Sequence, residues 1–148
     1  MEENNEYINS SDILEQMGDI TNDSISIACS EGQTDIVKLL LNDPRVDPSV
    51  MDNECVRIAC SRGYIEIVDL LIRDARVDPS TMDNECIRSA CSCGYIEIVK
   101  FLIKDARVDP STMDNECVRI AYSQGYTKIL DILAEDPRVT SSELIKDV

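Results

Sequence analysis

The sequence predicts an all-α solenoid, in which helix-turn-helix repeats are stacked and joined by extended, hairpin-like loops. The phrase Met-Asp-Asn-Glu-Cys recurs at 51–55, 82–86 and 113–117, with a constant spacing of 31 residues. Segments 51–81 and 82–112 are identical at 25 of 31 positions. A fixed period of this length is typical of stacked repeats, because a single two-helix unit cannot bury both of its faces without neighbours.

The period divides the chain into four repeats with a cap at each end. The expected segments are 1–19 (N-terminal tail and capping helix), 20–50, 51–81 and 82–112 (repeats one to three) and 113–148 (repeat four and C-terminal cap).

The two caps have local signals of their own. A short helix at 12–17 is expected, capped by Ser11 and closed by Gly18. At the other end, Thr140 and Glu143 have the spacing of a capping box, which predicts a last helical turn. The side chains expected to cover the first repeat are Ile13, Leu14 and Met17.

Each repeat is expected to contain two helices and a loop, as the unit at 51–81 illustrates. Asn53 is expected to be the N-cap of the first helix, since its side chain can accept hydrogen bonds from the first turn. Gly63 ends that helix, because glycine adopts the left-handed conformation in which helices often finish. The second helix, at about 65–73, is apolar on more than one side and is therefore expected to be covered by neighbours. Pro79 then predicts an extended loop.

The core of the repeat resembles the ankyrin repeat. Residues 59–71 read Ala-Cys-Ser-Arg-Gly-Tyr-Ile-Glu-Ile-Val-Asp-Leu-Leu, which is similar to the family's Ala-Ala-x-x-Gly-His-x-Glu-Ile-Val-x-Leu-Leu. The similarity returns at 28–40, 90–102 and, more loosely, 121–133, and it covers about 120 of the 148 residues. This resemblance implies an ankyrin-type α-solenoid.

The chain also departs from the family pattern. The Thr-Pro-Leu-His opening of the family is replaced by Glu-Cys-Val-Arg at 54–57. The repeat is also shorter than the usual length of about 33 residues, so the hairpin loop is expected to be trimmed. The phrase Asp-Pro-Arg-Val-Asp-Pro-Ser at 43–49 resembles divergent ankyrin proteins of amoeba-infecting giant viruses, which bears on origin more than on function.

The charge balance restricts the possible partners. The chain has 29 acidic and 14 basic residues, for a net charge of −15. Such a charge repels phosphate backbones and anionic membranes, so neither nucleic acid nor membrane is an expected partner. A basic protein would be attracted, although the charge could equally serve solubility alone. The polar, acidic start of the chain is unlike a signal peptide, and we expect an intracellular, cytoplasmic protein (in the host cytoplasm if viral).

The residue types argue against catalysis. The chain contains no histidine, and four of its five glycines mark the repeats instead of forming a phosphate-binding loop. The commonest general base and the usual nucleophile pairs are therefore absent. We expect no enzymatic activity and no cofactor.

The seven cysteines are expected to pack as small apolar residues, in preference to binding a metal or switching with redox state. Equivalent positions in successive repeats are expected to lie too far apart for a disulfide. Cys93 has no cysteine equivalent in the other repeats and is expected to be the exposed thiol. The two rows of equivalent positions are Cys29, Cys60 and Cys91, and Cys55, Cys86 and Cys117.

Arginines also occupy equivalent positions. Aspartate stands two residues before each member of the second row, which favours Asp–Arg ladders between repeats over a guanidinium strip for an acidic partner. The rows are Arg57, Arg88 and Arg119, and Arg45, Arg76, Arg107 and Arg138.

The family resemblance implies a binding strip formed by the hairpin tips and the outer end of the first helix, along the concave face. The tip methionines would be an adaptable contact surface, or would pack against neighbouring loops. Specificity is expected where the repeats differ, at Glu31, Arg62, Cys93 and Gln124. The full strip is Asn22, Ser30, Glu31, Met51, Asn53, Ser61, Arg62, Met82, Asn84, Ser92, Cys93, Met113, Asn115, Ser123 and Gln124.

Together these patterns predict a monomeric protein-binding module without catalysis, which captures a protein partner on its concave face. The alternative is an adaptor that brings a captured target to an enzyme complex such as a ubiquitin ligase. A third interpretation is a zinc- or redox-responsive protein.

Overall fold

The computed structural model describes residues 10–139, and this part of the chain is helical without strands. The predicted all-α solenoid is therefore confirmed. The helices are α1 (Ser10–Gln16), α2 (Asn22–Glu31), α3 (Thr34–Leu41), α4 (Val50–Arg62), α5 (Ile65–Ile72), α6 (Thr81–Cys93), α7 (Ile96–Leu102), α8 (Thr112–Gln124) and α9 (Thr127–Ala134).

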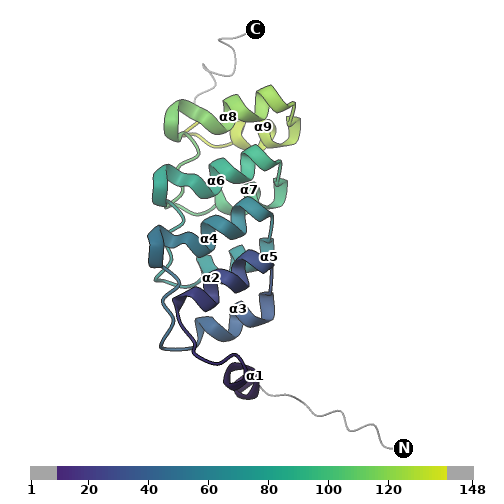
Figure 1. Cartoon of the computed structure of the whole chain (residues 1–148). Coiled ribbons are helices and arrows are strands. Elements are labelled where there is room, and N and C mark those ends of the chain that lie inside the picture. The colour runs from purple at the N-terminus through teal and green to yellow at the C-terminus, as the bar shows by residue number, and fades with distance from the viewer. Residues whose placement is uncertain (1–9, 140–148) are drawn as a thin grey trace, which may run out of the picture.

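The helices form one elongated stack (Figure 1). The first helices of the repeats, α2, α4, α6 and α8, pack on one another in that order, and the second helices, α3, α5, α7 and α9, form a parallel column. Each first helix also packs against the second helix that follows it. Every repeat is thus in contact mainly with its immediate neighbours, as expected of a solenoid.

A glycine ends each first helix. Gly63 has φ 81° and its backbone N–H donates to the carbonyl oxygen of Ala59, which confirms the predicted left-handed helix end. A Cβ at this position would lie 2.8 Å from the Tyr95 ring of the next repeat. Glycine is therefore required both by the backbone conformation and by the close approach of the neighbouring tyrosine.

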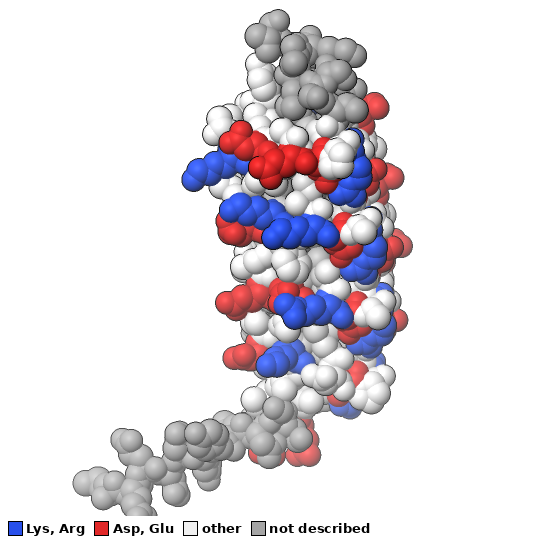
Figure 2. Space-filling model, turned by 180° about the vertical axis from the view of Figure 1, so that it is seen from behind, with Lys and Arg blue, Asp and Glu red and all other residues white. Residues whose placement is uncertain are grey.

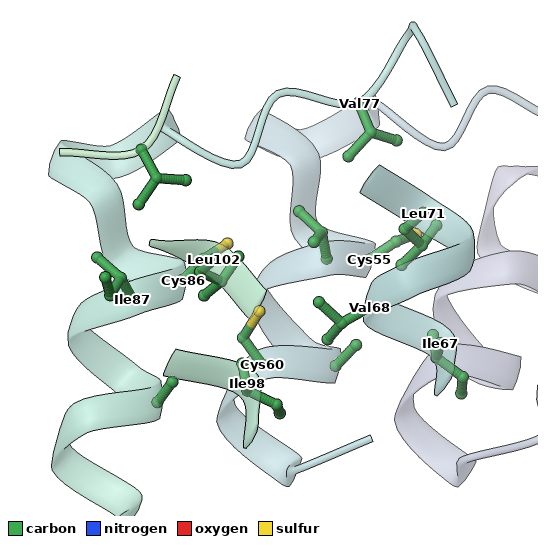
Figure 3. Close-up of a cluster of buried hydrophobic side chains, with 14 of the residues drawn as sticks. Cys55, Cys60, Ile67, Val68, Leu71, Val77, Cys86, Ile87, Ile98 and Leu102 are labelled. Atoms are coloured by element: carbon green, nitrogen blue, oxygen red, sulfur yellow. The ribbon is translucent and has the colours of Figure 1, made fainter. Parts of the chain in front are cut away.

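The core lies between the two columns of helices and is built from the same positions in each repeat (Figure 3). From the second helix come Ile67, Val68 and Leu71, all fully buried. Cys55 and Cys60 of the first helix are fully buried as well. Small thiol side chains therefore pack as apolar residues between the helices, as predicted.

The loop phrase Arg-Val-Asp-Pro-Ser also has a structural explanation. Val77 is buried beneath its loop. The Asp78 carboxylate accepts hydrogen bonds from the Ser80 backbone N–H (2.9 Å) and hydroxyl (2.7 Å). The loop is thus a series of side-chain-supported turns, which contains no strand. This arrangement agrees with the expected trimming of the hairpin.

The structure corrects the predicted role of Asn53. The N-cap of α4 is Ser49, and Asn53 lies within the helix range with a left-handed φ of 58°. The Asn53 Oδ1 atom instead accepts a hydrogen bond of 2.8 Å from the backbone N–H of Asp78, in the loop that leads to the next repeat. Asn22 and Asn84 accept equivalent bonds from Asp47 (2.7 Å) and Asp109 (2.7 Å). This asparagine row therefore joins successive loops.

The predicted N-terminal capping helix is present, with two corrections. Ser11 lies inside the helix and is not its N-cap. Helix α1 begins at Ser10, and Gly18 follows it with φ 77°. Leu14 packs against the core, but Met17 is 38% exposed and does not cover the first repeat as expected. The capping box predicted for Thr140 and Glu143 lies outside the described residues.

Replacing Asn53 by alanine should reduce the free energy of unfolding by about 1–2 kcal/mol, because the backbone N–H of Asp78 loses its acceptor and alanine tolerates the positive φ less well. Asn53→Gly should cost less, since glycine tolerates the positive φ of this position. Urea denaturation of the purified variants measures the difference. Asn42→Ala is the matched control, because the Asn42 side chain bonds only within its own repeat, to the carbonyl oxygen of Lys38 (2.9 Å). Equal losses in Asn53→Ala and Asn42→Ala would contradict the prediction.

Candidate functional site

Near the start of α4, α6 and α8, three residues within each helix range form a left-handed turn, and the regular helix follows this turn. Met51, Asp52 and Asn53 have φ values of 53°, 54° and 58°, and the equivalent residues of the next two repeats repeat this geometry. Asparagine and aspartate tolerate this conformation better than most residues, but methionine does not. The turn places the methionine side chains in solvent, with exposures of 65% for Met51, 54% for Met82 and 50% for Met113.

Hydrogen bonds from two successive first helices hold the left-handed turn. Arg57 donates from Nε to the carbonyl oxygen of Asp52 (3.0 Å) and from a terminal nitrogen to that of Met51 (3.1 Å). The Thr81 hydroxyl, at the start of α6, donates to the same Asp52 oxygen (3.1 Å). The unusual backbone is thus stabilised by residues that recur with it.

The structure removes two asparagines from the predicted binding strip. Asn53 and Asn115 are each only 7% exposed, and Asn84 and Asn22 are half-buried. Asn53 is engaged by the following loop, so it is not available to a partner. The sequence pattern predicts an exposed tip at this position. In the structure the left-handed turn directs the asparagine toward the following loop, and its role there is structural.

The other predicted strip residues lie at the outer ends of the first helices. We use the term variable row for Glu31, Arg62, Cys93 and Gln124, which are all exposed. The Cys93 thiol approaches the carbonyl oxygen of Ser61 in the preceding repeat at 3.7 Å. Because the first helices pack side by side, the variable row runs continuously across the stack. The neighbouring serines follow the same line: Ser61, Ser92 and Ser123 are exposed and Ser30 is half-buried.

Sequence reasoning missed a second line of apolar side chains beside the variable row. Ile27 is 55% exposed, and Ile58 and Ile120 are half-buried on the same side of their helices. Each stands four residues before a member of the variable row, which is one helical turn away. That spacing was a usable signal, because it places these residues on the same side of the helix. We call the surface formed by the variable row, the serines and these isoleucines the first-helix face.

Ion pairs between repeats border the first-helix face. Arg57 pairs with Glu85 of the next repeat at 2.7 Å, and Arg88 pairs with Glu116. The partners are glutamates of the following helix. The sequence analysis named neighbouring aspartates only for the other arginine row, so these glutamate partners come from the structure alone. The pairs fix the side chains of neighbouring first helices relative to one another.

The second arginine row ties loops together. Arg76 binds Asp74 through two nitrogens (2.9 and 2.6 Å) and donates to the carbonyl oxygens of Val46 (2.9 Å) and Leu41 (3.1 Å) in the preceding repeat. Arg107 and Arg138 make the same set of bonds one and two repeats further on. The Asp–Arg pairs therefore lie within one loop, which corrects the expected Asp–Arg ladder between repeats. The arginines link the repeats through backbone carbonyl oxygens, and this row has a structural role.

The arginines of this row also shift the acidity of their aspartates. Hydrogen bonds from Arg76 hold the pKa of Asp74 below its usual value, and Arg107 lowers the pKa of Asp105 in the same way. At the first position of the row, Arg45 lowers the pKa of Asp43 to about 2. The folded state is therefore stabilised by the deprotonated, charged forms of these carboxylates.

The opposite side of the stack carries charges of both signs. Figure 2 shows basic and acidic side chains alternating in bands across that side. Several are paired within one helix, as Arg73 is with Asp69 (2.9 Å) and Lys100 with Glu97 (2.9 Å). Local pairing leaves this side without a continuous field of one sign, in contrast to the net charge of the chain.

The cysteines form pairs that the sequence analysis did not anticipate. The two cysteine rows alternate through the core, so that the Cys60 thiol contacts Cys86 of the next repeat. Cys29 faces Cys55 and Cys91 faces Cys117 in the same way. The hydrogen bond within each pair, together with burial, raises the pKa of Cys29, Cys60 and Cys91 above the ordinary range. Cys29, Cys60 and Cys91 are therefore held as protonated thiols, which are poor nucleophiles. Within the first pair, the hydrogen bond from Cys29 lowers the pKa of Cys55.

The part of the chain that the structure describes contains neither a metal-binding cluster nor a membrane-spanning helix. No group of three or more metal-binding side chains is present among residues 10–139. No helix in the same range has the length and apolar character needed to cross a membrane.

The comparison with protein families agrees with this architecture. The model of the family described as ankyrin repeats (3 copies) matches residues 10–83, 25–114 and 58–142. These matches overlap and extend over most of the sequence, so the chain belongs to the ankyrin repeat family. A search of curated proteins found no match. Ankyrin repeats are generally protein-interaction modules, and the family is typically non-catalytic.

Replacing Arg76 by alanine should reduce the free energy of unfolding at pH 7 by about 1 kcal/mol or less, since the guanidinium is partly exposed. The lowered pKa of Asp74 means that this stabilisation is complete above the unfolded-state pKa of about 3.9 and is lost as pH falls through the folded value. The difference from wild type should therefore shrink at acid pH. Urea denaturation of wild type and Arg76→Ala, at pH 7 and at acid pH, measures this difference in the free energy of unfolding. Arg73→Ala, which removes only a pair within one helix, should have a smaller effect at pH 7.

Cys93 should be the only cysteine that reacts rapidly with a thiol reagent in the folded protein. It is exposed, whereas the other six are buried. Titration with Ellman's reagent should give one fast thiol per native chain and all seven after unfolding in guanidinium. A Cys93→Ser variant should lose the fast phase. Rapid modification of a second thiol in the native protein would show that a cysteine pair is accessible.

Proposed function

We propose that the chain is a protein-interaction module that binds a protein partner through the first-helix face, corresponding to the concave face of the family, and has no catalysis of its own. The observation that carries this proposal is the distribution of sequence variation. Variation between the repeats is concentrated in two sets of positions, and the set on the first helices lies on the first-helix face, where all four members are exposed. The first set is Glu31, Arg62, Cys93 and Gln124, and the second set, on the second helices, is Lys38, Asp69, Lys100 and Asp131. Residues at the repeated positions are used to hold the stack together.

The shape of the surface supports binding by a preassembled site. The first helices are fixed by interrepeat ion pairs, by the asparagine row and by a continuous core. A surface that is rigid before association loses little conformational entropy on binding. The net charge of −15 favours a basic partner through faster association. It disfavours nucleic acid and anionic membrane as partners.

We further propose that the protein acts as a monomer in the cytoplasm. The resemblance to repeat proteins of amoeba-infecting giant viruses makes an amoebal host the source in which the partner should be sought. If the partner proves to be a subunit of an enzyme complex, or is found together with one, the protein acts as an adaptor.

Affinity capture from amoebal lysate should recover a specific protein with the wild type and lose it with an Arg62→Glu/Gln124→Arg double variant. Both positions are exposed, so the fold should be preserved. A Lys38→Glu/Thr127→Arg variant is the matched control, because it changes net charge equally at exposed positions of the second helices. Capture that is lost equally in both variants, or in neither, would place the binding site elsewhere.

A further inference from the structure

One repeated pair of residues is exposed and is not used by its side chains in the core. Met-Asp occurs at 51–52, 82–83 and 113–114, and all six residues are exposed. The methionines are not among the apolar side chains that pack against the core. The aspartates form no ion pair within the described part of the chain. We call these three pairs the Met-Asp row.

The backbone of the Met-Asp row is held in an unfavourable conformation. The positive φ of Met51 is disfavoured for a side chain of this kind. Arg57 holds the turn through the carbonyl oxygen of Met51, which leaves the thioether side chain directed into solvent. Equivalent bonds run from Arg88 to Met82 (3.4 Å) and from Arg119 to Met113 (3.0 Å). Such backbone strain at an exposed residue is commonly retained where function uses it.

The Met-Asp row is retained where other exposed residues change. Between repeats three and four the exposed charges reverse at three equivalent positions, namely Glu97 and Lys128, Lys100 and Asp131, and Lys104 and Glu135. Met82 and Asp83 return unchanged at 113–114. Other exposed residues that are retained have side-chain bonds within the stack, as Ser123 and Arg138 do. The Met-Asp side chains have no such bond to explain why both residues are kept.

The spacing of the row indicates the shape of its occupant. The starts of α4, α6 and α8 lie one above another along the left edge of the stack (Figure 1), and these helices pack on one another. Packed helices lie roughly 8–10 Å apart. Seven residues of an α-helix rise by about 10 Å, so side chains with that separation share a face and meet successive methionines. An extended segment covers about 10 Å in three residues, which directs successive side chains to opposite faces.

Charge indicates the polar residues of the occupant. Each methionine is followed by an exposed aspartate without an ion pair, as Asp52 is. The arginines beside the first two turns are already paired, Arg57 with Glu85 and Arg88 with Glu116. The row therefore offers unpaired negative charge beside flexible apolar side chains that adapt to their contacts. Lysine or arginine next to the apolar residues of the occupant complements this charge.

We propose that the Met-Asp row is a second interaction surface, which receives an amphipathic α-helix of a protein partner with apolar side chains seven residues apart and lysine or arginine beside them. The row lies near the start of the first helices, whereas the variable row lies at their ends, as Met51 and Arg62 do in α4. The proposal thus goes beyond the proposed function, which uses the first-helix face.

The probe is a synthetic alanine-based peptide of about 20 residues, a length at which such sequences form helices in water. Leucine stands at every seventh position and lysine one helical turn later. One control peptide has the same composition with its leucines on different faces of the helix. A second control peptide has a central proline, which disrupts the helix. Fluorescence anisotropy measures the affinity of each peptide for the full chain.

Two variants of the protein test the row itself. The triple variant Met51→Gln/Met82→Gln/Met113→Gln removes the thioethers without changing the charge, and Met17→Gln is the matched control because Met17 is 38% exposed outside the row. The second variant, Asp52→Asn/Asp83→Asn/Asp114→Asn, removes the charges and keeps a residue that tolerates the left-handed turn. Urea denaturation checks that both variants fold, as expected of changes at exposed positions.

The affinity for the first peptide should fall about tenfold or more in the triple methionine variant, because the apolar contacts are lost, and stay within about twofold in Met17→Gln. The aspartate variant should bind more weakly and with a smaller dependence on salt. Both control peptides should bind more weakly to wild type. In methyl NMR spectra the signals of Met51, Met82 and Met113 should shift when the first peptide is added, and that of Met17 should not.

Other outcomes would overturn the inference. They are no binding of the first peptide, equal affinity for both arrangements of leucine, and equal affinity of wild type and the triple methionine variant. Equal binding of the proline peptide would show that an extended segment is the occupant. Arg62→Glu/Gln124→Arg should bind the first peptide as wild type does. Loss of peptide binding in that variant would place the helix on the first-helix face, which contradicts this inference and leaves the proposed function intact.

Discussion

Burial of the helix pairs against one another is the constraint on which the structure depends. A pair such as α4 and α5 has apolar side chains directed toward both neighbouring pairs, and it can cover neither set alone. Residues such as Ile67, Val68 and Leu71 are fully buried only because repeats lie on both sides. Apolar burial contributes roughly 25 cal/mol per Å², which makes this stacking the main stabilising term. The chain therefore cannot be divided into independently stable repeats.

Polar groups add direction to this stacking. Arg57 and Arg76 each bond to a neighbouring repeat, and Asn53 bonds to the loop that leads to the next repeat. Apolar contact alone would allow neighbouring pairs to slide, whereas hydrogen bonds have narrow distance and angle requirements. Near-identical repeats with identical bonds give a regular stack. Among the residues that vary, Arg62 and Cys93 make no side-chain hydrogen bond to a buried residue.

Within each repeat, different residues therefore maintain the stack and form the surface that is free to vary. Loop residues and the left-handed turn, including Asp52 and Asn53, are committed to holding the stack. The exposed side of the first helix is left to vary without damage to the fold. Ser89, where the other three repeats have isoleucine, lines a hollow between α6 and α8, and the stack is kept there. A repeat scaffold can in this way acquire specificity by single substitutions.

The amino-acid sequence by itself determined the period, the helix pairs, the glycine helix ends and the apolar core, because these depend on patterns within one repeat. It also indicated that the Arg76 row is structural and that the six repeated cysteines are buried. The tertiary structure decided which residues of adjacent repeats meet. Asn53 reaches a residue 25 positions ahead, Arg57 one 28 positions ahead, and Arg76 one 30 positions behind. None of these separations equals the 31-residue period, since each depends on the offset between stacked helices. The burial of Asn53, the pairing of Cys60 with Cys86 and the hollow at Ser89 follow from that offset, and a single sequence does not contain it.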